Sequence, residues 1–237
     1  MTEEKNLHNN VLILGDSYST FRGYVPKGYE VYYAEEIIRE TDLTRVEQTW
    51  WYQVLKECGW KLILNDSWCG APMGYTGYEG EDCSKTSSFL HRLRELEATG
   101  FFAKESIQKV FVFGGTNDSW ADAPLGEMQW ENWEEKDLYY VLPAIACFFH
   151  RLRKLLPKAQ IYCLMNIGLK PEIVGCMELA CKKYDLIPVT FPCMDRMGDH
   201  PTVQGMREIK TAVMEAIQSQ DQRVTEKGSL PVCANRK

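Results

Sequence analysis

The chain has 237 residues, of which 45% are hydrophobic and 25% are charged, and its formal net charge is −6 at pH 7. These proportions are ordinary for a globular protein, and the length suits one large domain. The acidic balance argues against nucleic acid and anionic membrane surfaces as partners, because neither would meet a basic stripe. No apolar stretch approaches the roughly 20 residues needed to cross a bilayer, so no membrane partner is expected.

The N-terminal segment, Met1 to Asn10, is polar and lacks the apolar run of a signal peptide. We therefore expect a cytoplasmic location for the chain as it stands, although a leader removed earlier would leave the same sequence. The nine cysteines are scattered, and no Cys or His cluster has the spacing of zinc ligands. Reduced thiols and no metal are expected.

Short apolar runs alternate with longer amphipathic segments, a pattern typical of repeated β-α-β units. The runs lack polar alternation, as expected for parallel strands covered by helices on both faces. Because such crossovers are right-handed, the predicted fold is a three-layer α/β/α sandwich with a five-stranded parallel sheet, flavodoxin-like in outline. Strands are predicted over 11–14, 61–64, 109–113, 160–165 and 186–190, and helices over 48–58, 84–98, 135–156, 172–184 and 202–218.

Some segments depart from this minimal plan. Pro143 predicts a kink or a later start for the third helix. Residues 18–49 and 119–134 are too long for simple connections, and their many aromatic residues argue for functional loops rather than disorder. The chain becomes polar after the last predicted helix, so a loose tail is expected over 219–237. With no repeat or linker, 1–237 is predicted to be a single domain with its core over about 11–218.

Four short polar segments follow predicted strands or can reach the same edge of the sheet. Since the carboxyl ends of parallel strands meet at one edge, where ligands of open α/β folds bind, these segments are expected to converge. Ser17 directly follows the first apolar run, which makes it the candidate nucleophile, with a helix cap as its alternative role. The segments are Gly15-Asp16-Ser17, residues 65–70, residues 114–118 and residues 195–202.

A serine hydroxyl needs an adjacent base to take its proton, and histidine suits that task near neutral pH. The chain has four histidines. His8 lies in the polar N-terminal segment, and His91 and His150 lie inside predicted helices. His200, in the loop before the last helix, is therefore the candidate base for Ser17.

A tetrahedral intermediate also needs preorganised donors, and losing one typically costs about 10²–10³ in rate. The candidates are the backbone N–H groups of Ser17 and Gly70 and the side-chain amide of Asn117. Glycine allows close approach of a backbone to a ligand, and an asparagine amide donates without titrating. The alternatives are a plain turn for Gly70 and an Asx turn for Asn117.

Together the four segments resemble the sequence blocks of the SGNH (GDSL-type) hydrolases. The resemblance covers about residues 11–218 and implies hydrolysis of a carboxylic ester through an acyl-serine intermediate, without metal or organic cofactor. Ser17 and His200 would be catalytic, with Ser17, Gly70 and Asn117 as the oxyanion hole. The blocks are Gly15-Asp16-Ser17, Gly70 after Asn65, Gly115-x-Asn117-Asp118, and His200-Pro201-Thr202 with Gly205.

The chain departs from the family pattern at the acid that would orient His200. The family usually has an Asp three residues before the His, and this chain has Met197 there. Asp199 directly precedes His200, and adjacent side chains of an extended segment point to opposite faces. Asp195 reaches the imidazole if Met197 and Gly198 form a turn, so it is the preferred acid and Asp199 the alternative. A Ser-His dyad supported by a backbone carbonyl remains a third possibility.

The family acts on acetylated carbohydrates, lysophospholipids, thioesters and aryl esters. The aromatic loops favour an acetyl or short-chain acyl ester on a carbohydrate as substrate, with Asp16, Trp120 and Tyr75 as substrate-binding residues. Rim packing is the other explanation for these rings. A lysophospholipase or thioesterase, a catalytically impaired glycan-binding relative, and a flavodoxin-like phosphate-binding module are alternative functions. The sequence does not fix the oligomeric state.

Overall fold

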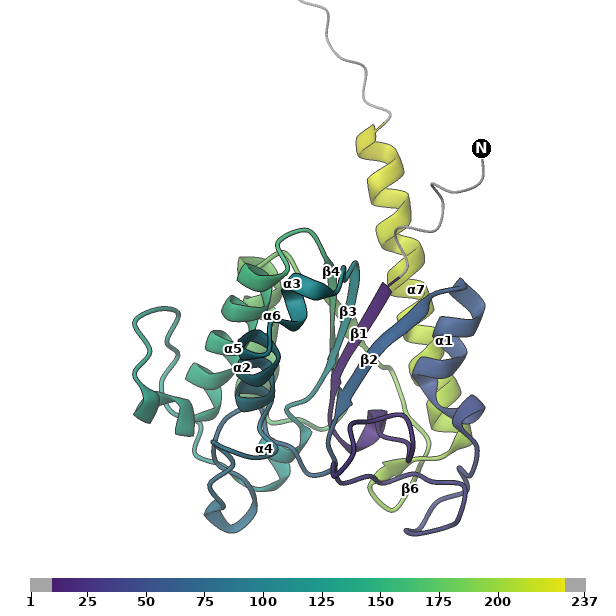
Figure 1. Cartoon of the computed structure of the whole chain (residues 1–237), viewed down its shortest axis with the longest axis horizontal. Coiled ribbons are helices and arrows are strands. Elements are labelled where there is room, and N and C mark those ends of the chain that lie inside the picture. The colour runs from purple at the N-terminus through teal and green to yellow at the C-terminus, as the bar shows by residue number, and fades with distance from the viewer. Residues whose placement is uncertain (1–9, 229–237) are drawn as a thin grey trace, which may run out of the picture.

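The structure is a computed structural model that describes residues 10–228 and contains one five-stranded sheet (Figure 1). All neighbouring strands are parallel, in the order β2-β1-β3-β4-β5, so β1 lies inside the sheet between β2 and β3. The predicted fold class is confirmed. The strands are β1 (Asn10–Gly15), β2 (Lys61–Ser67), β3 (Lys109–Phe113), β4 (Gln160–Met165) and β5 (Ile187–Thr190).

Helices cover both faces of the sheet, with α1 and α7 on one side and α2, α5 and α6 on the other (Figure 1). Two short helices, α3 and α4, are the remaining α-helices within the described residues. The bounds are α1 (Trp50–Cys58), α2 (Phe89–Ala98), α3 (Phe101–Lys104), α4 (Thr116–Trp120), α5 (Val141–Leu155), α6 (Pro171–Lys183) and α7 (Val203–Gly228).

The central strands bury side chains on both faces, which explains why their sequences lack polar alternation. In β1, Leu12 and Leu14 pack on the side of α2, α5 and α6. Val11 and Ile13 pack on the side of α1 and α7. Successive residues of a strand point to opposite faces, so one apolar run supplies two cores.

The third predicted helix is divided in the structure. A 3₁₀ turn occupies Glu135–Tyr139, and α5 begins only at Val141. Pro143 is then the third residue of α5, within the first turn, where backbone N–H groups have no partner inside the helix. The later start that Pro143 predicted is therefore the arrangement found.

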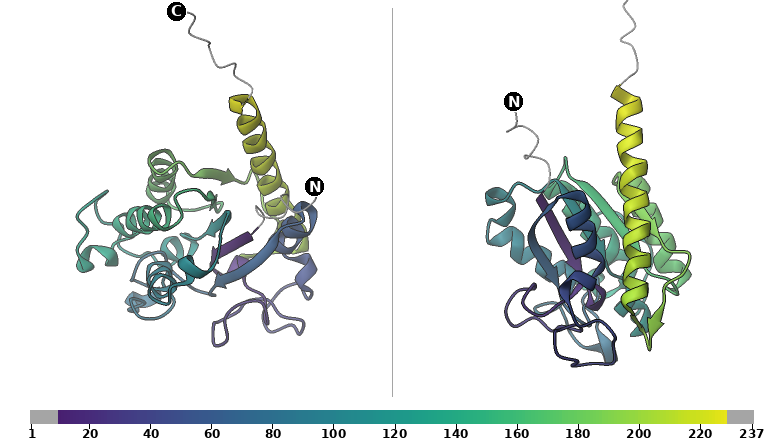
Figure 2. Two further views of the ribbon diagram at one scale, coloured as in Figure 1. Left: turned by 45° about the horizontal axis from the view of Figure 1, so that its top comes forward. Right: turned by 90° about the vertical axis from the view of Figure 1, so that its right-hand side faces the viewer.

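The last helix is longer than predicted. α7 runs to Gly228, ten residues beyond the predicted end at 218, and it extends past the sheet (Figure 2). The expected loose tail is therefore wrong as far as Gly228, and 229–237 lie outside the described residues. The polar residues after 218 include Gln, Glu, Arg and Lys, which are good helix formers, so loss of apolar residues did not end the helix. None of the helices within residues 10–228 is long and apolar enough to span a membrane.

A small antiparallel hairpin, which the sequence did not predict, precedes α7. It pairs β6 (Arg196–Met197) with β7 (His200–Pro201), and Arg196 lies opposite Pro201 while Met197 lies opposite His200. Gly198 in the two-residue turn has a φ of +57°, a left-handed conformation that glycine adopts readily. The hairpin sets the position of His200.

Candidate active site

Ser17 lies where the chain leaves β1 at the carboxyl edge of the sheet. β1 ends at Gly15, and Ser17 begins a short 3₁₀ turn capped by Asp16, whose Oδ1 atom accepts a 3.1 Å hydrogen bond from the N–H of Tyr18. A Cβ atom at Gly15 would lie 2.4 Å from the Ser67 hydroxyl. Glycine is therefore required for the close passage of β1 past β2 at this edge.

The structure brings Ser17 and His200 together. The Nε2 atom of His200 lies 2.9 Å from Ser17 Oγ, although 183 positions separate the two residues in the chain. This distance is within the reach required of a general base. The hydroxyl and the imidazole come from opposite ends of the chain, β1 and the hairpin before α7.

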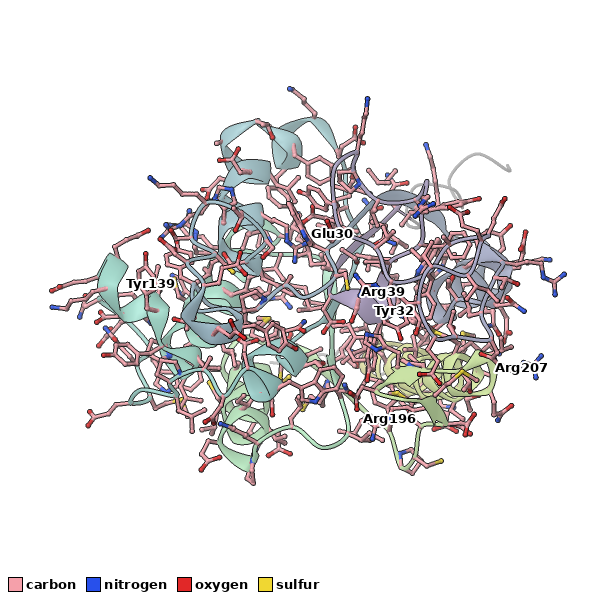
Figure 3. The ribbon with its side chains drawn as sticks, turned by 90° about the horizontal axis from the view of Figure 1, so that it is seen from below. Glu30, Tyr32, Arg39, Tyr139, Arg196 and Arg207 are labelled. Carbon is pink, nitrogen blue, oxygen red and sulfur yellow. The ribbon has the colours of Figure 1, made fainter. Side chains whose placement is uncertain are left out.

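Aromatic rings surround the imidazole of His200. The ring of Tyr32 stacks on it, with centroids 3.5 Å apart and an interplanar angle of 10°. The half-buried ring of Trp120 approaches it edge-on, with centroids 6.0 Å apart. Looking onto the carboxyl edge of the sheet, Figure 3 shows Tyr32 beside Arg39, near the middle of this face.

Burial and two cations favour the neutral form of His200. Loss of solvent is the largest cause, and with the positive charges of Arg39 and Arg196 it lowers the pKa of His200 from its ordinary value of 6.5 to about 4. The imidazole is therefore uncharged at neutral pH and has a lone pair with which to accept a proton from Ser17.

None of the described carboxylates bonds to the His200 imidazole. The carboxylate of Asp195 accepts a hydrogen bond from the Thr202 hydroxyl, and its backbone oxygen accepts a 3.1 Å bond from the Thr202 N–H. The backbone oxygen of Asp199 accepts a 2.5 Å bond from the Tyr18 hydroxyl.

The register of the hairpin explains this placement. The turn falls at Gly198 and Asp199, so Met197 lies opposite His200. Asp195 is then beside Thr202, beyond the last pair of the hairpin. The predicted curl of the chain exists, but it directs Asp195 to Thr202 and not to His200.

Two predicted oxyanion donors have free backbone N–H groups. Within residues 10–228, neither the N–H of Ser17 nor that of Gly70 donates a hydrogen bond to another protein group. Gly70 has a φ of +82°, which turns its peptide into a conformation that other residues rarely adopt. Both groups therefore remain available to a ligand oxygen.

Asn117, the third predicted donor, lies in the first turn of α4 and is oriented by two neighbours. Its Nδ2 atom donates a 3.0 Å hydrogen bond to the Ala71 carbonyl, and its Oδ1 atom accepts a 3.0 Å bond from the Tyr78 hydroxyl. One N–H of the amide remains unused by these contacts.

Buried polar contacts join the segments that carry these donors. The N–H of Trp68 donates to the Gly15 carbonyl at 3.1 Å, which links the segment of Gly70 to that of Ser17. The fully buried carboxylate of Asp118 accepts bonds of 2.9–3.0 Å from the Met73 N–H. Burial raises the pKa of Asp118 to about 6. Asp118 thus fixes the loop after Gly70.

A buried ion pair braces the same edge of the sheet. The Nη1 atom of Arg92 lies 2.9 Å from the Oδ2 atom of Asp66, and both side chains are only 2% exposed. The Nη2 atom of Arg92 also donates to the Gly15 carbonyl at 3.1 Å. Arg92 therefore ties α2 to the ends of β1 and β2.

The three predicted substrate-binding residues are placed differently from one another. Trp120 lies beside His200, as described above. Asp16 is fully buried, and burial raises its pKa to about 7. Because it caps the turn of Ser17 and has no exposed surface, the predicted substrate contact of Asp16 is wrong.

Tyr75 also requires correction as a substrate-binding residue. Its ring is fully buried, and its hydroxyl contacts Arg94 and Glu135, at 2.5 and 3.1 Å. Both partners lie on the side of α2 and α5, so the hydroxyl of Tyr75 is engaged there by protein groups. Packing around the loop, which the sequence does not reveal, decides these contacts.

The sequence did not single out Tyr32, Arg39 or Arg196 as site residues. The aromatic content of the loop over 18–49 did indicate a functional segment, and Tyr32 belongs to it. Nothing in the local sequence shows which of its rings meets the histidine. Among the residues that the structure describes, no group of three or more His, Cys, Asp or Glu side chains could hold a metal ion.

Comparison with known proteins identifies the family of the chain. Residues 9–217 match the GDSL-like lipase/acylhydrolase family. The chain belongs to this family. Its members are hydrolases, and the resemblance predicted from the four sequence blocks is confirmed.

Two solved structures from Bacteroides are similar to this family member over most of its length. A GDSL-like lipase from Bacteroides ovatus is 34% identical, with a TM-score of 0.83 and coverage of 89% of this chain and 98% of that one. A second, from Bacteroides uniformis, is 38% identical, with a TM-score of 0.82 and coverage of 89% and 96%. No curated protein matches the chain.

A more distant similarity extends to a carbohydrate esterase. A family two carbohydrate esterase from Clostridium thermocellum is 14% identical, with a TM-score of 0.61, and the match covers 91% of this chain and 65% of that one. At this identity the likeness shows a shared fold.

Proposed function

We propose that this GDSL-family protein is a serine esterase that acts through an acyl-Ser17 intermediate. Its proposed substrate is a carbohydrate that carries a short-chain acyl ester, such as an acetyl ester. The observation that carries the proposal is the 2.9 Å contact between Ser17 Oγ and His200 Nε2. A hydroxyl and a neutral imidazole at this separation form a nucleophile and its base.

The reaction follows from the positions of these groups. His200 takes the Ser17 proton as Oγ attacks the ester carbonyl carbon, and the N–H groups of Ser17, Gly70 and Asn117 donate to the resulting oxyanion. The imidazolium gives its proton to the leaving alcohol as the ester C–O bond breaks. A water molecule, deprotonated by His200, then attacks the acyl carbon, and the imidazolium returns that proton to Ser17 Oγ as the acyl–Oγ bond breaks and the acid leaves.

Aromatic surface near the dyad supports a carbohydrate as the alcohol part of the substrate. Trp120 is half-buried beside His200, and the ring of Tyr78, which contacts Asn117, is 41% exposed. Flat aromatic faces offer apolar area to the C–H face of a sugar, while the Tyr78 hydroxyl adds a polar edge. The shared fold with a carbohydrate esterase is consistent with this substrate class.

One experiment tests the reaction and the substrate class together. The native protein and Ser17→Ala are treated with a fluorophosphonate probe and assayed on p-nitrophenyl acetate and acetylated xylan. We expect labelling of Ser17, release of acetate by the native protein, and loss of both in the variant. Equal turnover by the two proteins would contradict the proposal, and activity confined to lysophospholipid or thioester substrates would replace the carbohydrate ester.

Because none of the carboxylates within residues 10–228 bonds to His200, a second candidate function is a catalytically impaired protein that binds glycans. In that case the probe leaves Ser17 unlabelled and no ester is hydrolysed, while acetylated xylan still retards the protein in affinity electrophoresis. Ser17→Ala would then bind as the native protein does. The two candidates thus differ in probe labelling.

A further inference from the structure

The His200 imidazole needs a partner that fixes its plane, and among the described residues no carboxylate provides one. The nearest ring to it is instead that of Tyr32, with centroids 3.5 Å apart and planes 10° from parallel. We propose that Tyr32 is the positioning residue for His200, in the place that an acid occupies in a Ser-His-Asp triad. The inference rests on the proposed catalytic role of Ser17 and His200.

The geometry of the stack explains how a ring can replace an acid as the orienting group. An imidazole that turns about its Cβ–Cγ bond swings one edge toward whatever covers its face. With the face of Tyr32 at 3.5 Å, that rotation meets ring atoms at once. The imidazole plane is therefore restrained, and Nε2 stays at 2.9 Å from Ser17 Oγ.

Tyr32 is itself held firmly, which a positioning role requires. Its hydroxyl donates a 3.0 Å hydrogen bond to the Glu40 carbonyl, and its backbone N–H donates a 2.9 Å bond to the Thr20 hydroxyl. The Arg39 guanidinium carbon lies over its ring, 5.6 Å from the centroid. The residue is 9% exposed, so its side chain is packed in place and does not form a free surface.

Two further tyrosines fix the backbone on either side of His200. The Tyr18 hydroxyl donates to the carbonyl before it, that of Asp199, at 2.5 Å, and the Tyr33 hydroxyl donates to the carbonyl after it, that of Pro201, at 3.0 Å. Both tyrosines come from the chain that follows β1. The segment that carries the nucleophile thus also holds the histidine's backbone and covers its ring.

The stack also suits the charge that develops during the reaction. When His200 takes the Ser17 proton, the imidazolium lies against the π face of Tyr32, an attractive arrangement for a cation. The other groups that face the imidazole are the rings of Tyr18, Tyr33 and Trp120 and the guanidinium groups of Arg39 and Arg196. Neither guanidinium stabilises the imidazolium, which leaves the aromatic face as its support.

The experiment compares Tyr32→Ala and Tyr32→Phe with the native protein on p-nitrophenyl acetate. Tyr32→Ala is expected to lower kcat by about 10–100-fold, the scale of a small misplacement of a catalytic group, with KM changed less than about threefold. Tyr32→Phe keeps the ring and is expected to stay within about twofold of the native kcat. Tyr24→Ala, in the same loop and 43% exposed, is the matched control.

The pH profile separates positioning from a general loss of structure. Without the ring, water reaches the imidazole, so the acid limb of kcat/KM should move upward from about 4 toward the ordinary histidine value of 6.5 in Tyr32→Ala. Tyr32→Phe and Tyr24→Ala should leave this limb in place. If circular dichroism shows that Tyr32→Ala does not fold, Tyr32→Leu replaces it, because leucine is apolar but has no flat face. Tyr32→Leu should show the same lowered kcat and the same upward shift of the acid limb.

The possible outcomes are distinct. A folded Ala or Leu variant with native kcat and an unmoved acid limb overturns the positioning role of Tyr32. A Phe variant as impaired as the Ala variant overturns it as well, because the ring would then not be the active part. Native turnover by Ser17→Ala instead removes the proposed esterase mechanism, whatever the Tyr32 variants do.

Discussion

The hydroxyl of Tyr78 donates a 3.0 Å hydrogen bond to the Oδ1 atom of Asn117. An amide side chain has one acceptor oxygen and one donor nitrogen, so this contact determines which way the Asn117 amide faces. Its Nδ2 atom is directed to the Ala71 carbonyl at 3.0 Å and keeps one proton for a ligand. An exposed tyrosine thus orients the buried amide of Asn117, the predicted oxyanion donor.

Tyr78→Phe should therefore lower kcat on p-nitrophenyl acetate by about tenfold, less than the roughly 10²–10³ expected when the donor itself is lost in Asn117→Ala. The two changes act through one group, so adding Tyr78→Phe to Asn117→Ala should cause no further loss. Steady-state kinetics of the four proteins would show this. Additive losses would mean that Tyr78 acts independently of Asn117.

The pH dependence of kcat/KM should follow the low pKa of His200, which is about 4 because of burial and the charges of Arg39 and Arg196. A base works only when unprotonated, so activity should be constant from pH 7 down to about 5 and should fall about tenfold per pH unit well below 4. Initial rates on an ester without ionisable groups would show this limb. A limb near 6.5 would indicate an imidazole open to water.

The two arginines provide a further test of the same pKa. Arg39→Gln and Arg196→Gln each remove a positive charge that disfavours the imidazolium, so each should move the acid limb to higher pH. Lys27→Gln removes one exposed positive charge from the same long loop as Arg39 and should leave the limb unchanged. Equal shifts in all three variants would point to net charge rather than to these two positions.

Asp195→Asn should affect stability more than catalysis. The Asp195 carboxylate accepts from the Thr202 hydroxyl, which in turn accepts a 3.1 Å bond from the Gly205 N–H at the start of α7. Weakening this link should cost about 0.5–1.5 kcal/mol in the free energy of unfolding, while kcat changes less than about threefold. Asp199→Asn, at the hairpin turn, is the comparison and should change neither.

Urea unfolding and initial rates measure the two effects. A loss of about 10⁴ in kcat for Asp195→Asn, the size seen when a triad carboxylate is neutralised, would mean that Asp195 moves onto His200 during the reaction. The orienting role of Tyr32 would then be unnecessary.

Gly205→Ala should destabilise the protein and lower its activity. A Cβ atom there would lie 2.1 Å from the Asp195 carbonyl oxygen, so α7 and the hairpin of His200 would have to separate, at a cost of about 1–3 kcal/mol. Gly175→Ala, inside α6, meets nothing within 4 Å and should stabilise by up to about 1 kcal/mol. Thermal melting and kcat would distinguish the pair, and equal melting temperatures would contradict this packing.

The architecture and the two candidate catalytic residues, Ser17 and His200, could be predicted from the sequence alone. Unbroken apolar runs such as Val11–Leu14 must be buried on both faces, which requires a parallel sheet between helices and places Ser17 at its carboxyl edge. His200 was identified by elimination, since the other histidines lie in helices or in the N-terminal segment. These conclusions depend on the types of residues and their order along the chain, and they need no knowledge of contacts between distant residues.

The directions of the side chains around Ser17 and His200 depend on packing between distant segments, which the sequence does not show. The hairpin register places Asp195 on Thr202, and packing engages the Tyr75 hydroxyl on the side of α2 and α5 while it lays Tyr32 on His200. A shift of one residue in such a pairing exchanges the faces to which side chains point. Contacts between residues far apart in the chain set that register, so the sequence around His200 showed neither that Tyr32, Arg39 and Arg196 lie beside it nor how their side chains are oriented.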